Sequence, residues 1–269
     1  KSKELYLGKY EIQEITAPHG MVLNGTIQTV ELTYAGQEVV ITETAGNLYN
    51  ERQKVKVSLS KVLEQNELFG IGMNGELKNI TFGLYAKTDL IAGDGTVIPA
   101  GGLIEIVTFD DNGMATVSTD LPLGSYYLQE RSTDEHYILD DTHYEFEFSY
   151  GSQETQVIEI SVNGGDPIKN DLKYGMVSGR KVDEDGHVIA GAIFGLFRND
   201  ENEYTAENAY LTAESAQDGT FKFEKVPFGT WVVREIQPAK GFVLNEKAYP
   251  VTVSEDGDVV NIQLENRYI

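Results

Sequence analysis

Short runs in which hydrophobic and polar residues alternate recur along the whole chain. The alternation is regular at residues 144–148, 157–162 and 259–264. A period of two residues places every second side chain on one face, which is typical of a half-buried β-strand. Turn-forming pairs such as Asp256-Gly257 separate the runs. The pattern predicts a chain that is almost entirely β-stranded, with a short helix or a loop at residues 205–216.

One strand motif occurs three times and ends in a glutamate each time. A glycine is followed at every second position by an aromatic residue, an aliphatic residue and a glutamate, in residues 8–14, 124–130 and 229–235. Six residues after each glutamate, a related segment begins. A second motif, which contains Phe-Gly-Leu, occurs only twice, in residues 80–85 and 192–197. The chain is therefore built from an internal repeat.

The order of the two motifs defines the predicted domains. It is the same in residues 53–171 and 172–269, whereas residues 1–52 contain only the glutamate motif. We therefore predict two complete domains preceded by the C-terminal part of a third, and we expect the chain to continue upstream. Domains of about 100–120 residues with short strands and frequent turns indicate β-sandwiches.

Each repeat places a glutamate on an otherwise hydrophobic strand face. Glu235 shares its face with Trp231 and Val233, because residues two apart in a strand point the same way. Glu130 and Glu14 stand at the same place in the other two copies. An ionised carboxylate is costly in a hydrophobic core. We expect each glutamate to be protonated or strongly paired.

Counting residues two apart along other strands finds a lysine and an asparagine in each complete domain. Lys61 follows Val55, Val57 and Leu59 on one face, and Lys181 lies in the corresponding strand of the last domain. The last strand of each domain ends in an inward-facing asparagine, Asn170 or Asn266. Each complete domain therefore holds a lysine in its first strand, a glutamate in the middle and an asparagine in its last strand.

These three groups can react with one another. A hydrophobic site favours the neutral amine of lysine, which is a nucleophile. The side-chain amide carbon of asparagine is the electrophile, and a protonated glutamate can hydrogen-bond the amide oxygen and pass protons to the departing ammonia. The product is a lysine–asparagine isopeptide bond that forms once per molecule. The sequence thus predicts no enzyme with turnover.

The chain resembles the Cna B-type (SpaA-like, prealbumin-like) domains of Gram-positive pilins and cell-wall-anchored adhesins. The segments that carry the resemblance are residues 180–186, 189–197, 231–235 and 14–20. The resemblance implies tandem Ig-like or prealbumin-like β-sandwiches in which the lysine bonds the last-strand asparagine and the glutamate assists. The implied crosslinks are Lys61–Asn170, assisted by Glu130, and Lys181–Asn266, assisted by Glu235.

The sequence departs from the family pattern in three places. Lys61 lacks the Asp-x-x-Gly turn that follows Lys181, and the family's Ala-Pro pair is replaced by Ser132-Thr133 in the middle domain. The last domain reverses the pair, as Pro238-Ala239. The incomplete domain supplies Glu14 and Asn50, and its lysine is expected before residue 1. Lys1 and Lys3 directly precede the glutamate strand and are poor partners for Asn50.

Composition excludes several other functions. The 43 acidic residues outnumber the 21 lysines and arginines, for a net charge of −22, which argues against nucleic acid and anionic membrane surfaces. The absence of cysteine excludes disulfides, thiolate metal sites and cysteine nucleophiles. Aspartate-rich segments at residues 110–113 and 183–186 are interpreted as hairpin turns, because they lack further calcium ligands. We expect no metal and no cofactor.

These observations favour a stalk or shaft segment of an extracellular, cell-wall-anchored adhesin or pilin. Its partners would be other domains of the same surface protein or other pilus subunits. Two alternatives stay open. The insertions at residues 65–79 and 199–217 could bind a host matrix protein or glycan, or the domains could be accessory parts of a secreted enzyme.

Overall fold

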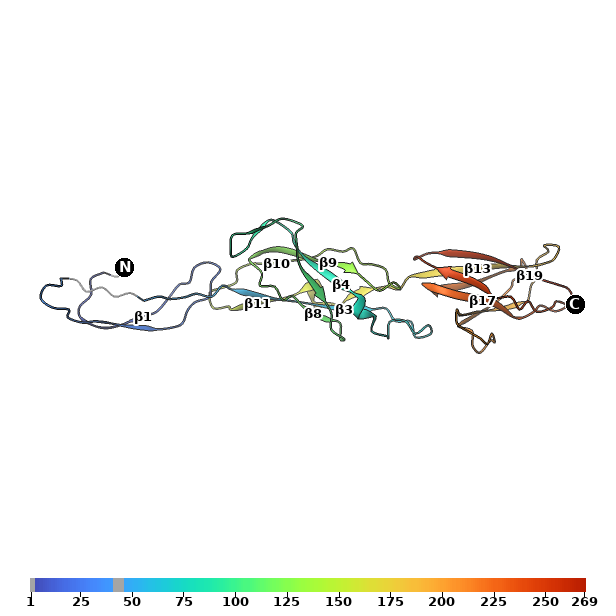
Figure 1. The fold of residues 1–269 in the computed structure, drawn as a ribbon, viewed down its shortest axis with the longest axis horizontal. Helices are drawn as coiled ribbons and strands as arrows, with labels where there is room; N and C mark the ends of the chain where they lie inside the picture. Colours follow the sequence, from blue (N-terminus) through green and yellow to red (C-terminus); the bar gives the residue numbers. More distant parts are fainter. Residues whose placement is uncertain (1–2, 41–45) are drawn as a thin grey trace.

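The computed structural model describes residues 3–40 and 46–269, which form three β-sheet units in a row along an extended molecule (Figure 1). The first unit lies at one end of the long axis and the C-terminus at the other. No helix among the described residues is long and apolar enough to cross a membrane. The all-β fold predicted from the alternating pattern is confirmed.

The first unit is one small sheet without a core. Strands β1 (Gly8–Ile12) and β2 (Gln28–Leu32) pair antiparallel, with Tyr10 opposite Val30. Neither hydrophobic core of the molecule includes a described residue of this unit. Large hydrophobic side chains such as Tyr6 and Ile15 are exposed. The described part of this unit is therefore a two-stranded sheet with no hydrophobic core of its own.

The middle unit is a sandwich of two four-stranded sheets around one core. The strands of the first sheet, in spatial order, are β10 (Tyr144–Phe148), β9 (Gly124–Ser132), β4 (Thr81–Ala86) and β7 (Leu103–Thr108). The second sheet has the order β11 (Val157–Ser161), β3 (Lys54–Leu63) and β12 (Ile168–Asn170), with β8 (Met114–Thr116) also paired to β3. The remaining elements are β5 (Leu90–Ile91), β6 (Val97–Ile98) and the 3₁₀ turns η1 (Glu76–Asn79) and η2 (Val162–Gly165). Inward residues of both sheets, among them Leu59, Phe82 and Leu128, fill the space between them.

The last unit repeats this arrangement. One sheet has the order β15 (Leu211–Glu214), β14 (Ile193–Arg198), β17 (Gly229–Gln237) and β18 (Tyr249–Val253). The other has the order β16 (Thr220–Pro227), β13 (Tyr174–Asp183) and β19 (Val259–Asn266). Gly179 of β13 leaves room for the Phe221 ring, which would come within 2.0 Å of a Cβ atom at this position. The glycine therefore belongs to the core-facing side of β13, although it is not hydrophobic.

The segment 205–216 differs from the predicted short helix or loop. A turn is followed by strand β15, which pairs antiparallel with β14 so that Leu211 lies opposite Leu196. Leu211 and Ala213 pack against the core, whereas Thr212 is exposed. The strand spans only four residues, which is too short for a period of two to distinguish it from a loop.

The first and last strands of each complete unit lie side by side. Strand β3 pairs in parallel with β12, and β13 pairs in parallel with β19. Lys61 is opposite Ile168, and Lys181 is opposite Leu264, so each lysine lies two residues before the level of its asparagine. This register brings together groups that are far apart in the sequence.

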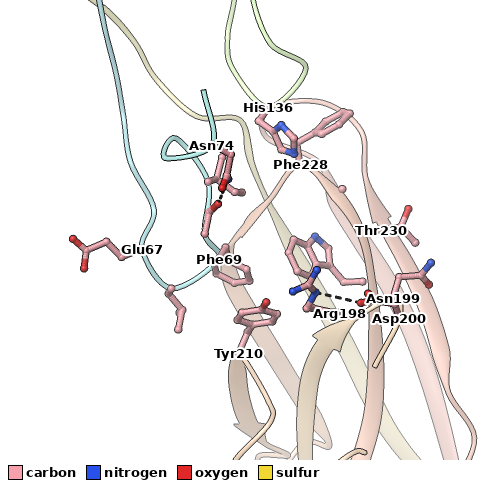
Figure 2. A pocket seen from close by; sticks show the side chains of 15 residues that line it. Glu67, Phe69, Asn74, His136, Arg198, Asn199, Asp200, Tyr210, Phe228 and Thr230 are labelled. Carbon is pink, nitrogen blue, oxygen red and sulfur yellow. Dashed lines mark hydrogen bonds and ion pairs between the residues drawn. The ribbon is translucent and has the colours of Figure 1, made fainter. Parts of the chain in front are cut away.

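An aromatic contact joins the two complete units. Asn66 and Ile71 bond to each other through both backbone N–H groups, which closes a tight hairpin with Phe69 near its tip. The Phe69 ring stacks on Tyr210 at 4.8 Å and meets Trp231 edge-on at 5.0 Å, both in the last unit (Figure 2). The contact therefore docks an insertion of the middle unit onto the sheet of the last one.

Replacing Phe69 with alanine is expected to loosen this joint. Trp231 is the only tryptophan and is 8% exposed, so its fluorescence reports directly on the contact. We expect a red-shifted emission and stronger quenching by acrylamide, since two ring contacts of about 0.5–1.5 kcal/mol each are lost. Leu68→Ala, at a neighbouring residue that is 55% exposed, is the control. Unchanged emission in Phe69→Ala would contradict the docking role.

Candidate crosslink sites

The predicted triad of the last unit comes together in its core. Lys181 and Asn266 lie on adjacent strands of one sheet, and Glu235 reaches them from β17 in the opposite sheet. The Lys181 amine donates to Asn266 Oδ1 at 2.6 Å, and Asn266 Nδ2 donates to both carboxylate oxygens of Glu235 at 2.9 Å. The glutamate therefore contacts the amide nitrogen and not, as predicted from the sequence, the amide oxygen, because the lysine amine occupies the oxygen. None of the three residues is more than 2% exposed.

Burial makes the Lys181 amine easier to deprotonate. Loss of water around the charged form lowers the pKa of Lys181 to about 8, although the nearby carboxylates of Glu235 and Glu265 act in the opposite direction. The amine nitrogen lies 4.0 Å from Glu235 Oε1. A substantial fraction of the amine is therefore neutral in mildly alkaline water, as a nucleophile must be.

The middle unit has the same arrangement, with one addition. Lys61 donates to Asn170 Oδ1 and lies 3.4 Å from Glu130 Oε1, while Asn170 Nδ2 donates to the two Glu130 oxygens at 2.9 and 3.0 Å. Asn170 Nδ2 also lies 2.9 Å from Thr133 Oγ1. Burial lowers the pKa of Lys61, and the charge of Glu130 partly opposes this shift. The departures around Lys61 and at Ser132-Thr133 do not disturb the geometry of the triad.

A turn glycine supports the backbone of each lysine. Gly113 accepts the N–H of Lys61 at 2.7 Å, and Gly219 accepts that of Lys181 at 2.7 Å. Both glycines have a positive φ, and a Cβ atom on either would lie within 2.7 Å of the lysine carbonyl oxygen. Only glycine fits this combination of backbone conformation and close approach. The Asn112-Gly113 and Asp218-Gly219 turns therefore hold the backbone of the two lysines in place.

A family model described as a prealbumin-like fold domain, SpaA, matches residues 71–164 and 175–268. The chain belongs to the SpaA family. The two matches fall within the two predicted complete domains, residues 53–171 and 172–269, whose limits stay a prediction. The resemblance to Cna B-type (SpaA-like) domains is confirmed.

Several solved structures align with this chain, and the first of them shares its fold. The Bacillus anthracis TIE protein aligns with a TM-score of 0.68 at 22% identity over 97% of this chain, which spans 42% of that structure. The C-terminal fragment of the pilus adhesin SpaC from Lactobacillus rhamnosus GG aligns at a TM-score of 0.46 and 15% identity, covering 81% of this chain and 98% of the fragment. The major pilin subunit BcpA of Bacillus cereus aligns at 0.42 and 16% identity, with coverage of 98% and 86%. No curated protein sequence matches the chain.

In the first unit, Glu14 and Asn50 are hydrogen-bonded to each other. Asn50 Nδ2 donates to Glu14 Oε2 at 2.6 Å and to the Val22 carbonyl oxygen at 2.9 Å. Both side chains are half-buried. Among the residues that the structure describes, no lysine pairs with either of them; Lys3 is exposed, and Lys1 lies outside the described residues.

In the aspartate turns of the SpaA-type domains, the carboxylate oxygens already accept hydrogen bonds from N–H and O–H groups of the chain. Asp183 accepts the backbone N–H groups of Asp185 and His187 and the hydroxyl of Tyr268 at 2.9 Å. Asp110 accepts the N–H groups of Asn112 and Met114 in the same way. In the described part of the chain, no cluster of three or more histidine, aspartate or glutamate residues is arranged to hold a metal ion.

Sequence reasoning missed two residues at the triads. Thr133, noted only as a departure from the family pattern, contacts the reacting amide of Asn170. Asn245, ten residues after Glu235, donates its backbone N–H to Glu235 Oε2 at 2.7 Å. The signal for Asn245 was present in the repeat, because Asn24 occupies the same place after Glu14.

Proposed function

We propose that each complete domain forms a lysine–asparagine isopeptide bond by itself, without the help of an enzyme. The neutral amine of Lys181 or Lys61 attacks the side-chain amide carbon of Asn266 or Asn170, and a new C–N bond forms. The bond from that carbon to Nδ2 breaks. The glutamate carboxyl group relays a proton from the attacking amine to the departing nitrogen, which leaves as ammonia.

One observation carries this proposal. In both domains the lysine amine donates to the asparagine Oδ1 while the asparagine Nδ2, which must leave, lies on the glutamate carboxyl group. The glutamate carboxyl group thus contacts the departing nitrogen and also lies near the attacking amine, 3.4 Å from Lys61 Nζ and 4.0 Å from Lys181 Nζ. Burial of all six residues excludes water that would compete as a nucleophile. Since the product stays in the chain, the reaction is completed once and has no turnover.

We infer that the crosslinked domains form a stalk or shaft segment of a Gram-positive surface protein, displayed outside the cell and anchored to its wall. The bond would join the first strand of a domain to the last, so that load passes between neighbouring domains without peeling the strands between them. Residues 170–181 connect the two sites. The partners would be other domains of the same protein or other pilus subunits.

The intact mass of the denatured chain tests the crosslinks. Each bond expels one ammonia, about 17 Da, so we expect a mass about 34 Da below the value calculated from the sequence. Asn266→Ala, measured against its own calculated mass, should retain a deficit of about 17 Da from the middle domain. A wild-type chain at its full calculated mass would overturn the proposal.

The alternative role in binding a host matrix protein or glycan rests on the two insertions. Both contribute to an open hollow of about 720 Å³ at the joint, next to Phe69, Tyr210 and Trp231 (Figure 2). The three rings pack against one another, and Trp231 donates its indole N–H to the Pro227 carbonyl oxygen at 2.9 Å. Their contacts are therefore already used within the chain, which favours a structural role for the insertions.

A further inference from the structure

One residue position has the same contact in all three units. The residue ten places after the glutamate donates its backbone N–H to Oε2 of that glutamate, at 2.7 Å in every case. The three donors and acceptors are Asn24 and Glu14, Asp140 and Glu130, and Asn245 and Glu235. The carboxyl group of the triad is thus held from outside the triad in each unit.

The side chain at this position fixes the direction of the N–H group. Oδ1 of Asn24, Asp140 or Asn245 accepts the backbone N–H two residues further on, at 2.9, 3.0 and 2.9 Å respectively. This local turn is one that asparagine and aspartate form equally well. Both residue types therefore keep the backbone N–H group bonded to the glutamate carboxyl group.

The asparagines make a second contact that aspartate cannot make. Asn245 Nδ2 donates to the carbonyl oxygen of Glu265 at 2.8 Å, and Asn24 Nδ2 donates to that of Tyr49 at 2.6 Å. Glu265 and Tyr49 are the residues immediately before Asn266 and Asn50. A single asparagine thus connects the glutamate to the strand that carries the reacting amide.

The middle domain differs in this second connection. Both domains pair this position with the tyrosine four residues on, since Asp140 accepts the Tyr144 hydroxyl at 2.5 Å and Asn245 Nδ2 donates to the Tyr249 hydroxyl at 3.1 Å. Asp140 has no amide donor that could reach the strand of the reacting amide. The reacting amide of Asn170 is held instead by the hydroxyl of Thr133. The last domain has Pro238 at the place of Thr133, counted from the glutamate, and proline has no hydroxyl. The two domains therefore hold their electrophile by different means.

We propose that Asn245 is a positioning residue for crosslinking of the last domain, because it sets the Glu235 carboxyl group and the Asn266 strand relative to each other. This inference rests on the proposed isopeptide bond. Correct placement of reacting groups governs the rate of an intramolecular reaction, so loss of one connection should slow the reaction and leave the fold intact. In the middle domain Asp140 provides only the hold on Glu130.

The test follows crosslinking of the full chain after cell-free synthesis, by intact mass and by proteolytic fragments that assign each bond to its domain. Rates are measured from pH 6 to pH 10 in wild type, Asn245→Ala and Asn245→Asp. We expect the plateau rate at high pH, where the Lys181 amine is neutral, to fall about 10-fold in Asn245→Asp, which loses the bond to Glu265, and further in Asn245→Ala, which also loses the local turn. The rate of the middle domain in the same molecules is the internal control and should not change.

The pH profile separates positioning from a change of charge. A new carboxylate in Asn245→Asp shifts the midpoint of the profile, but only a positioning role lowers the plateau. Asp140→Asn should raise the plateau of the middle domain, a gain that loss of stability does not produce. Unchanged plateau rates in both Asn245 variants would overturn this inference alone. Failure of the wild-type chain to lose ammonia would overturn it together with the proposed function.

Discussion

Replacing Glu235 with alanine is expected to abolish the crosslink of the last domain and leave that of the middle domain intact. The mass deficit of the denatured chain should fall from about 34 to about 17 Da, because one ammonia is no longer lost. Glu235 is the only carboxyl group whose oxygens accept from Asn266 Nδ2 among the described residues. Loss of a general acid–base group slows such a reaction about 10²–10⁴-fold. We therefore expect this crosslink not to form during the time in which the protein is produced.

Glu235→Gln separates the two roles of the glutamate. Glutamine can still accept a hydrogen bond from Asn266, but it cannot relay a proton, so we expect the same loss of crosslinking. Glu214→Ala is the matched control, because Glu214 lies on β15 of the same sheet and is exposed. A deficit of about 34 Da in Glu235→Ala would mean that the glutamate has no part in the reaction.

Replacing Asn266 with alanine is expected to lower the free energy of unfolding of the last domain by about 4–5 kcal/mol. The bond would close a segment of 85 residues, and a covalent closure of that length restricts the unfolded chain by this amount if it acts as a disulfide does. Chemical denaturation followed by Trp231 fluorescence measures the loss. Wild-type and variant chains of equal stability would contradict a crosslink in this domain.

The same variant should acquire a pH dependence that the crosslinked protein lacks. Its Lys181 amine is free and buried, with a folded-state pKa of about 8 against 10.5 for an exposed lysine. Between these values the unfolded chain binds the proton more readily than the folded one, so stability should rise as the pH increases from about 8 to about 10. Below pH 8 the cost of burying the charge is fully present. Lys181→Met, which has no amine to titrate, should show no such rise.

Much of the fold and of the candidate sites was predictable from the strand period. Trp231 and Val233 must face the core, and Glu235 follows from them by counting two residues. The same count places Lys61 and Asn266, and the structure brings each lysine, glutamate and asparagine of a complete domain within reach of one another. The internal repeat strengthened the prediction of the sites, because each polar residue of one complete domain has a counterpart in the other.

The contacts that depend on loops were not predictable in this way. Phe69 docks on Tyr210 and Trp231 through a hairpin whose direction depends on the bond between Asn66 and Ile71, and no period marks it. Asn245 acts through its backbone N–H group, which every residue except proline carries. The repeat marks the position of Asn245, because Asn24 occupies the same place after Glu14, but the strand period does not show that its side chain bonds Glu265.

Because the first and last strands are paired, the proposed bonds between them would also limit the length to which the chain can be stretched. At about 3.4 Å per residue, the described chain would extend to roughly 900 Å if every residue were free to straighten. The two bonds would remove segments of 109 and 85 residues from that length. About 230 Å would remain, most of it in the first unit, for which no bond is proposed. The two complete domains would therefore behave as a tether of nearly fixed length, whatever the stability of the strands enclosed by their bonds.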